Sequence, residues 1–155
     1  MKKLIIPQLI GLIVMLVGYA VACGLGIGPL LVGFFPSLLA GAVASTLAKD
    51  HAAGAAVWGA TMPAWVIGAY ARTSPHADAA SIAVMSAAAV VVIMVFFVRP
   101  ASRDLKIGFW PALACLVVTG AAVAATFGLD NPLPALAGIA AQIVLVRVTR
   151  TKEPA

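Results

Sequence analysis

Long apolar segments fill nearly the whole chain, and each is about as long as a membrane is thick. Short links that carry charge, glycine or proline separate them, and we place the segments at residues 4–25, 30–48, 52–71, 79–98, 109–129 and 133–148. A transmembrane helix needs about 20 consecutive apolar residues to cross a hydrocarbon core of about 30 Å. The pattern predicts an all-α fold, a polytopic helical membrane protein with six transmembrane helices in a single integral membrane domain over residues 1–155.

The composition excludes a separate water-soluble domain. Hydrophobic residues make up 63% of the chain and charged residues 10%, against about 45–50% and about 25% in soluble proteins. The net charge of +5 raises the question of nucleic-acid binding. Such binding needs cations clustered on one face, whereas these are spread over the links, so we expect no nucleic-acid partner. The expected surroundings are the lipid bilayer.

The charged link Arg99–Lys106 determines how the segments are oriented, because it holds three cations between two apolar segments. If the N-terminus lies inside, the inner side carries nine of the ten lysines and arginines, and the outer side carries Arg72 alone. The nine are Lys2, Lys3, Lys49, Arg99, Arg103, Lys106, Arg147, Arg150 and Lys152. This asymmetry is what the positive-inside rule describes. It predicts a multi-pass protein of the cell inner (plasma) membrane with both termini cytoplasmic.

The first apolar segment imitates a secretory or lipoprotein signal. Met1-Lys2-Lys3 precedes it, and Ala20-Val21-Ala22-Cys23 lies at its end. However, the apolar run is about 20 residues long, whereas signal peptides have about 7–15 apolar residues at their centre. Ala20 also stands where a lipoprotein site prefers a larger aliphatic residue. We therefore expect an uncleaved first transmembrane helix.

Ionisable residues that could carry chemistry fall outside the expected membrane interior. Every acid and both histidines lie in the links or the tail: Asp50, Asp78, Asp104, Asp130, Glu153, His51 and His76. Proton-coupled transporters and metal or haem sites in membranes place such residues within the helices. The sequence therefore predicts no buried proton relay, no catalytic set, no cofactor and no metal site, and hence no enzyme.

Neutral polar residues do occur near the centres of four apolar segments. They are Thr61, Ser86, Thr119 and Gln142. One interpretation is a polar pocket or path for a small solute. The other is that the hydroxyls bond back to their own helices while Gln142 clasps a neighbouring helix. Gln142 is the strongest candidate, because a primary amide cannot satisfy itself within one helix.

Two prolines fall inside expected helices, and three polar residues gather in expected outer links. Pro36 and Pro63 predict helix kinks, since proline frees the carbonyl four residues earlier. Such a kink forms either a gate or a simple bend. His76, Asp78 and Asp130 are candidates for a small outer mouth. Asp78 and Asp130 also precede apolar segments, where acids commonly cap helix N-termini.

Two short segments carry a family resemblance. Gly33-Phe34-Phe35-Pro36-Ser37-Leu38-Leu39-Ala40 resembles the G-F-F-P segment in the small membrane subunit of tripartite tricarboxylate transporters. Phe127-Gly128-Leu129 with Pro132-Leu133-Pro134 is similar to that family's late L-P segment. That family has a longer link after its second helix, and its chain ends soon after the L-P segment, whereas here a sixth segment follows. The resemblance implies an accessory subunit of a carboxylate importer.

Two functions therefore remain open from the sequence. The leading hypothesis is a small transporter or channel unit for a small solute, acting as a homo-oligomer or beside a larger membrane subunit. The alternative is a non-catalytic accessory or structural subunit of a larger membrane complex.

Overall fold

Helices make up every regular element in the described part of the chain. The structure is a computed structural model that describes residues 2–27 and 29–150, with side chains at 2–27 and 33–148. Its elements are α1 (Lys2–Leu25), α2 (Pro29–Ala48), α3 (His51–Thr73), α4 (Ala79–Val92), the π-helix η1 (Ile93–Val98), α5 (Arg99–Asp104), α6 (Phe109–Leu129) and α7 (Leu133–Arg150). Because α4, η1 and α5 continue one another, the fold has six helical rods. The all-α prediction is confirmed.

Four of these rods are long and apolar enough to cross a membrane by length and composition: Lys2–Leu25, His51–Thr73, Ala79–Asp104 and Phe109–Leu129. α2 and α7 contribute shorter apolar stretches, Gly33–Ala48 and Leu133–Val148. A chain with several such helices indicates a multi-pass membrane protein in contact with the lipid bilayer.

The fourth rod extends past the point where the sequence predicts its end. We expect a stop at Arg99-Pro100, but the helix continues to Asp104. The wide turns of η1 directly precede Pro100, and the Arg99 amide donates to the carbonyl of Met94, five residues earlier. In a straight α-helix the proline ring would press on the carbonyl four residues earlier. The wider turns relieve that contact, so the helix can pass the proline.

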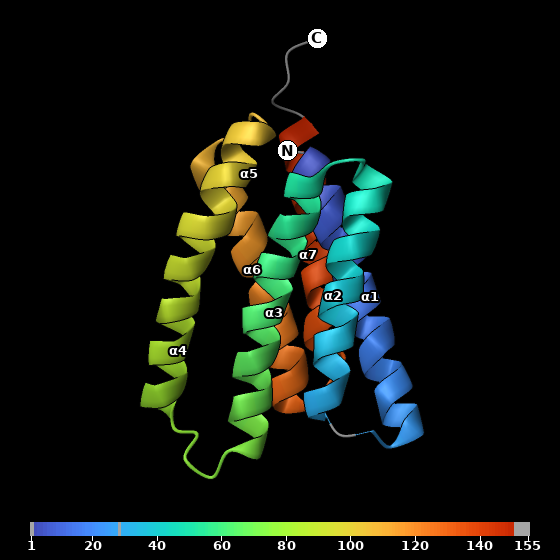
Figure 1. Ribbon diagram of the computed structural model, residues 1–155, viewed down its shortest axis with the longest axis vertical. Coiled ribbons are helices and arrows are strands. Elements are labelled where there is room, and N and C mark those ends of the chain that lie inside the picture. The colour runs from blue at the N-terminus through green and yellow to red at the C-terminus, as the bar shows by residue number, and fades with distance from the viewer. Residues whose placement is uncertain (1, 28, 151–155) are drawn as a thin grey trace.

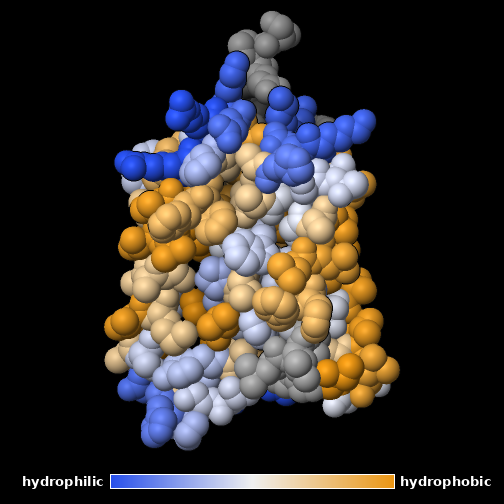
Figure 2. All heavy atoms as spheres, viewed as in Figure 1, coloured by the Kyte–Doolittle hydropathy of each residue, from blue (hydrophilic) through white to orange (hydrophobic). Residues whose placement is uncertain are grey.

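The rods alternate in direction, so the links gather at two ends (Figure 1). One end holds the start of α1, the α2–α3 link, α5 and the end of α7. We call it the basic end, because it carries seven of the eight lysine and arginine side chains that the structure describes. Figure 2 shows hydrophilic residues at both ends and hydrophobic residues over the face between them. Arg72 lies at the opposite end, near the last turn of α3.

α3 is the central helix of the bundle. Two-thirds of its apolar window is buried, against 11% for the fourth rod. Small residues allow this close packing: a Cβ on Gly68 would stand 2.6 Å from the Ala124 carbonyl oxygen of α6. On the other side, a Cβ on Gly54 would stand 2.7 Å from the Gly41 carbonyl oxygen of α2. These glycines serve contacts within the bundle, as close helix packing in lipid requires.

The fourth rod packs differently along its length. α4 has no buried residue and stands apart from the central helices in Figure 1. Beyond it, Ile93 and Val98 of η1 are buried, and the Phe97 ring covers the space where a Cβ on Gly59 would stand. The rod is therefore packed against the bundle near the basic end, whereas along α4 its side chains are not buried by the other helices.

Candidate functional site

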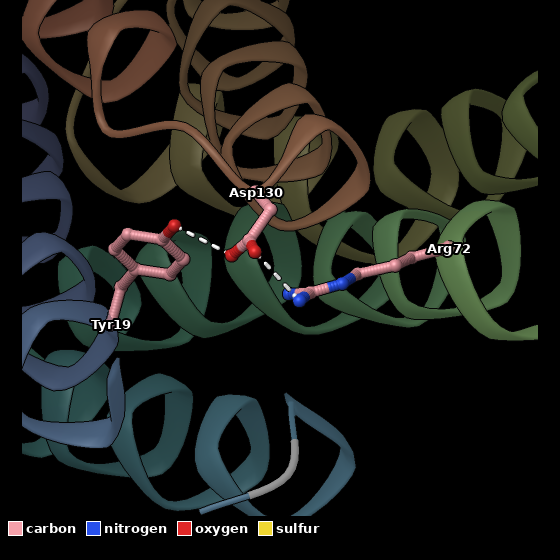
Figure 3. Close-up of polar contacts among 3 residues, drawn as sticks. All are labelled: Tyr19, Arg72 and Asp130. Carbon is pink, nitrogen blue, oxygen red and sulfur yellow. Dashed lines mark hydrogen bonds and ion pairs between the residues drawn. The ribbon is translucent and has the colours of Figure 1, made fainter. Parts of the chain in front are cut away.

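A polar triad joins three parts of the fold at the end opposite the basic end. The Tyr19 hydroxyl donates to Oδ1 of Asp130 at 2.7 Å, and a guanidinium nitrogen of Arg72 contacts Oδ2 at 2.7 Å. Figure 3 shows the three side chains converging from α1, α3 and the α6–α7 link. We call Tyr19, Arg72 and Asp130 the outer triad. It ties α1 and α3 to the end of α6 through one carboxylate.

Local structure explains the position of Asp130. It follows the last residue of α6 with φ 52 and ψ 45, a left-handed conformation that aspartate tolerates better than most residues. Tyr19 is held against α6 because its ring meets the edge of Phe127, with ring centres 5.7 Å apart. The Arg72 and Asp130 side chains are 35% and 44% exposed, so their ion pair is accessible at the surface of the end opposite the basic end.

The three residues predicted to form an outer mouth do not all converge. Asp78 caps α4: its carboxylate accepts from the Ser81 amide at 2.7 Å, while the Ser81 hydroxyl accepts from the Asp78 amide. The hydrogen bond from the Ser81 amide, and after it the Ser81 side chain, lower the pKa of Asp78 below its usual value. His76 contributes its carbonyl, which accepts from the Tyr70 hydroxyl at 3.1 Å. Among the described residues, only Asp130 of the three belongs to the outer triad.

A second polar group is buried between α6 and α7. The Gln142 amide nitrogen donates to the Cys115 carbonyl at 2.9 Å and to the Thr119 hydroxyl at 3.0 Å. The Cys115 thiol donates back to the Gln142 side-chain oxygen at 3.3 Å. All three residues are fully buried. Two of the four predicted interior residues, Thr119 and Gln142, are therefore brought together, in the clasp that the second interpretation of Gln142 describes.

The other two predicted interior residues lie elsewhere. Thr61 is buried, and its hydroxyl donates to the Val57 carbonyl of its own helix at 3.0 Å. Ser86 of α4 is half-buried and lines a groove of about 170 Å³ between α4, α3 and α6. The four residues therefore do not form one continuous polar surface.

The two prolines predicted to kink helices lie inside continuous helices, Pro36 in α2 and Pro63 in α3. Pro36 packs closely on Gly18 of α1, where an added Cβ would stand 2.7 Å from the proline Cβ. It also lines an apolar groove of about 790 Å³ between α1 and α2. Pro36 thus shapes the contact between the first two helices.

Gln8 of α1 is a candidate site residue that the sequence reasoning missed. Its exposed fraction is 0%, and neither atom of its amide group has a hydrogen-bond partner among the described residues. A lone amide in an apolar segment is the signal that could have found it. The sequence reasoning considered residues near segment centres, whereas Gln8 lies two turns from the start of α1.

Gln8 lies at the same level as Gln142. α1 and α7 run antiparallel, and Leu12 packs over Gly138, its two methyl carbons 3.4 and 3.8 Å from where a Gly138 Cβ would stand. Gln8 precedes Leu12 by four residues and Gln142 follows Gly138 by four, which is about one helical turn toward the basic end in each case. Residues four apart share a helix face, so this register puts the two glutamines at a similar depth, each about one turn from the Leu12–Gly138 contact. We call Gln8, Cys115, Thr119 and Gln142 the amide layer.

In the described part of the chain, no group of three or more His, Cys, Asp or Glu side chains could hold a metal ion. Comparisons with protein-family models, with curated proteins and with solved structures each found no match for this chain. The assignment of a function therefore rests on the amide layer and the outer triad.

Proposed function

We propose that this chain is a transport unit, a transporter or channel, that passes a small uncharged solute across the inner membrane. The observation that carries the proposal is the amide layer, a group of neutral donors and acceptors buried where the bundle is otherwise apolar. All charged side chains that the structure describes lie in the links or near the helix ends. A charged solute would find no counter-charge at the amide layer, so the layer favours solutes without charge.

The proposed orientation places the basic end in the cytoplasm, with both termini inside. Seven described lysine and arginine side chains at that end, against Arg72 at the other, support this orientation through the positive-inside rule. The amide layer then lies toward the cytoplasmic side and the outer triad at the outer surface.

Passage requires a movement between these two groups. Apolar side chains fill the space between them on α1 and α6: Leu12, Met15, Val123 and Phe127, all buried in one cluster. A polar solute could cross this zone only if α1 separated from α6. Since Asp130 holds Tyr19 of α1 to the end of α6, we assign the outer triad the role of an outer gate.

The test is solute flux through liposomes that contain the purified protein as their only protein. Gln142→Leu should reduce urea and glycerol flux to that of protein-free liposomes, because it removes both donors of the amide layer's central residue. Thr126→Val is the matched control: it also removes a buried polar group, here a hydroxyl that bonds at 2.8 Å to the Ala122 carbonyl of its own helix. Unchanged flux in Gln142→Leu would remove the proposed function.

The second candidate function is an accessory subunit of a larger membrane complex. The position of α4 favours it, because α4 is apolar apart from Ser81 and Ser86 and has no buried residue. Gentle extraction from the native membrane followed by native mass spectrometry distinguishes the two. A stoichiometric larger partner would support the accessory subunit, as in the tripartite tricarboxylate resemblance, and a homo-oligomer alone would support the transport unit.

A further inference from the structure

The unmet hydrogen bonds of Gln8 need an explanation. A primary amide offers two donor hydrogens and an acceptor oxygen, and at Gln8 none of them has a partner among the described residues. Leaving such a group buried and unsatisfied destabilises a fold, because the amide has lost its hydrogen bonds to water without replacing them. Native structures place a partner at most buried polar groups, either in the protein or in a bound molecule.

Gln142 leaves one complementary position open at the same level. Both of its amide hydrogens are used, toward the Cys115 carbonyl and the Thr119 hydroxyl. Among the described residues its oxygen accepts only from the Cys115 thiol, which is a weak donor, and an amide oxygen can accept two hydrogen bonds. The layer therefore presents a free donor and acceptor on Gln8 and a free acceptor position on Gln142.

We propose that Gln8 and Gln142 bind one small uncharged molecule that both donates and accepts hydrogen bonds, the chemical class of urea and glycerol. The molecule would donate to the Gln142 oxygen while Gln8 both donates to it and accepts from it. The proposal deepens the proposed function and rests on it for the route by which the solute reaches the layer. Gln8 thereby becomes a ligand-binding residue, while Gln142 both binds the solute and holds α7 to α6.

Side-chain amide NMR tests this binding independently of flux. The chain has only two glutamines, Gln8 and Gln142, and one asparagine, Asn131. The ¹⁵N-labelled protein in lipid nanodiscs should therefore give three pairs of side-chain amide signals, one pair for each NH₂ group, and Gln8→Met identifies the Gln8 pair by removing it. Adding urea should shift both glutamine signals to saturation. Asn131 at the exposed α6–α7 link is the internal control and should not show a saturable shift.

Two further comparisons sharpen the test. Tetramethylurea has no N–H group, so it should not produce the saturable shift of Gln142. Gln8→Met keeps the side-chain length but removes the donor and acceptor, and it should weaken urea binding at Gln142 about tenfold or more, the loss expected for one or two hydrogen bonds.

The outcomes are distinct. Two results would overturn the inference. The first is a contact between the amide protons of Gln8 and Gln142 without a urea shift, because the two glutamines then satisfy each other. The second is a contact of Gln8 to water alone, because a permanent water molecule then occupies the amide layer. Saturable urea binding without flux in liposomes would contradict the proposed function but support the binding site. Flux that is unchanged in Gln8→Met would remove Gln8 from the site while leaving the function.

Discussion

The Tyr19 hydroxyl donates a hydrogen bond of 2.7 Å to Asp130, which lies 111 positions later in the sequence. The bond joins the last two turns of α1 to the end of α6, and Arg72 of α3 holds the second oxygen of the same carboxylate. The phenol is largely buried, whereas the guanidinium is partly exposed. The two bonds should therefore differ in strength, since solvent weakens the more exposed bond, between Arg72 and Asp130.

Removing the phenol hydroxyl tests this difference. Tyr19→Phe should lower the free energy of unfolding by about 0.5–1.5 kcal/mol, as for one lost hydrogen bond. Arg72→Gln should lower it by about 0–1 kcal/mol, as for an exposed ion pair. Thermal unfolding in detergent measures both, and Tyr70→Phe, which loses an exposed bond to a carbonyl, is the control. An Arg72→Gln effect larger than that of Tyr19→Phe would contradict the assignment.

A methyl group at Gly68 should disturb a close contact between α3 and α6. An added Cβ would stand 2.6 Å from the Ala124 carbonyl oxygen and 2.9 Å from the Phe127 Cβ. Gly68→Ala should therefore destabilise the fold by about 1–3 kcal/mol, as overpacking does. Gly24→Ala is the matched control, because nothing lies within 4 Å of its added Cβ. It should be neutral or stabilising by about 0.5–1 kcal/mol, and equal losses in both variants would show that α3 and α6 do not pack this closely.

Cysteine labelling on intact cells tests the proposed orientation. In a Cys23→Ala background, where Cys115 is buried, Asp104→Cys and His76→Cys introduce exposed thiols at the basic end and at the opposite end. A membrane-impermeant maleimide should label His76→Cys in intact cells and Asp104→Cys only after lysis. The reverse pattern would place the basic end outside.

The start of α4 should depend on pH through Asp78. Its pKa is lowered in the folded protein, chiefly by the bond from the Ser81 amide. The carboxylate cap is therefore fully present above the unfolded pKa of about 4 and is lost as pH falls through the lower folded value. Hydrogen exchange of the Ser81 amide, corrected for its intrinsic pH dependence, should lose protection in that range. Asp78→Asn should remove this step while keeping a cap, and a step that persists in the variant would assign it to another group.

The positions of the helices along the chain follow from the sequence, but which face of each helix is buried does not. Long apolar runs and short polar links predict six rods, and one interpretation of Asp78 and of Gln142 anticipates the α4 cap and the α6–α7 clasp. However, Ser81 and Ser86 are the only polar residues of α4 and do not form a polar stripe, so no periodicity shows that it is the most exposed helix. The pairing of Tyr19 with Asp130 likewise depends on how α1 lies against α6, which local patterns do not contain.

Gln8 and the fourth rod show two further limits of the sequence reasoning. An amide two turns from a lysine-rich start resembles an interfacial residue, and only the packing of α1 against the other helices of the bundle makes it buried. Pro100 is an ordinary stop signal for an α-helix. The π-helical turns before it change the local geometry, and these turns arise from six apolar residues with no distinguishing pattern.

The most direct test of the account compares urea with guanidinium, two planar molecules of nearly the same size, in liposomes that contain only this protein. Guanidinium carries a charge that the amide layer has no group to balance. The account predicts that the protein accelerates urea entry well above that of protein-free liposomes, that Gln142→Leu removes the acceleration, and that guanidinium enters no faster than without protein. Guanidinium entry at the rate of urea, or urea entry at the protein-free rate, would contradict it.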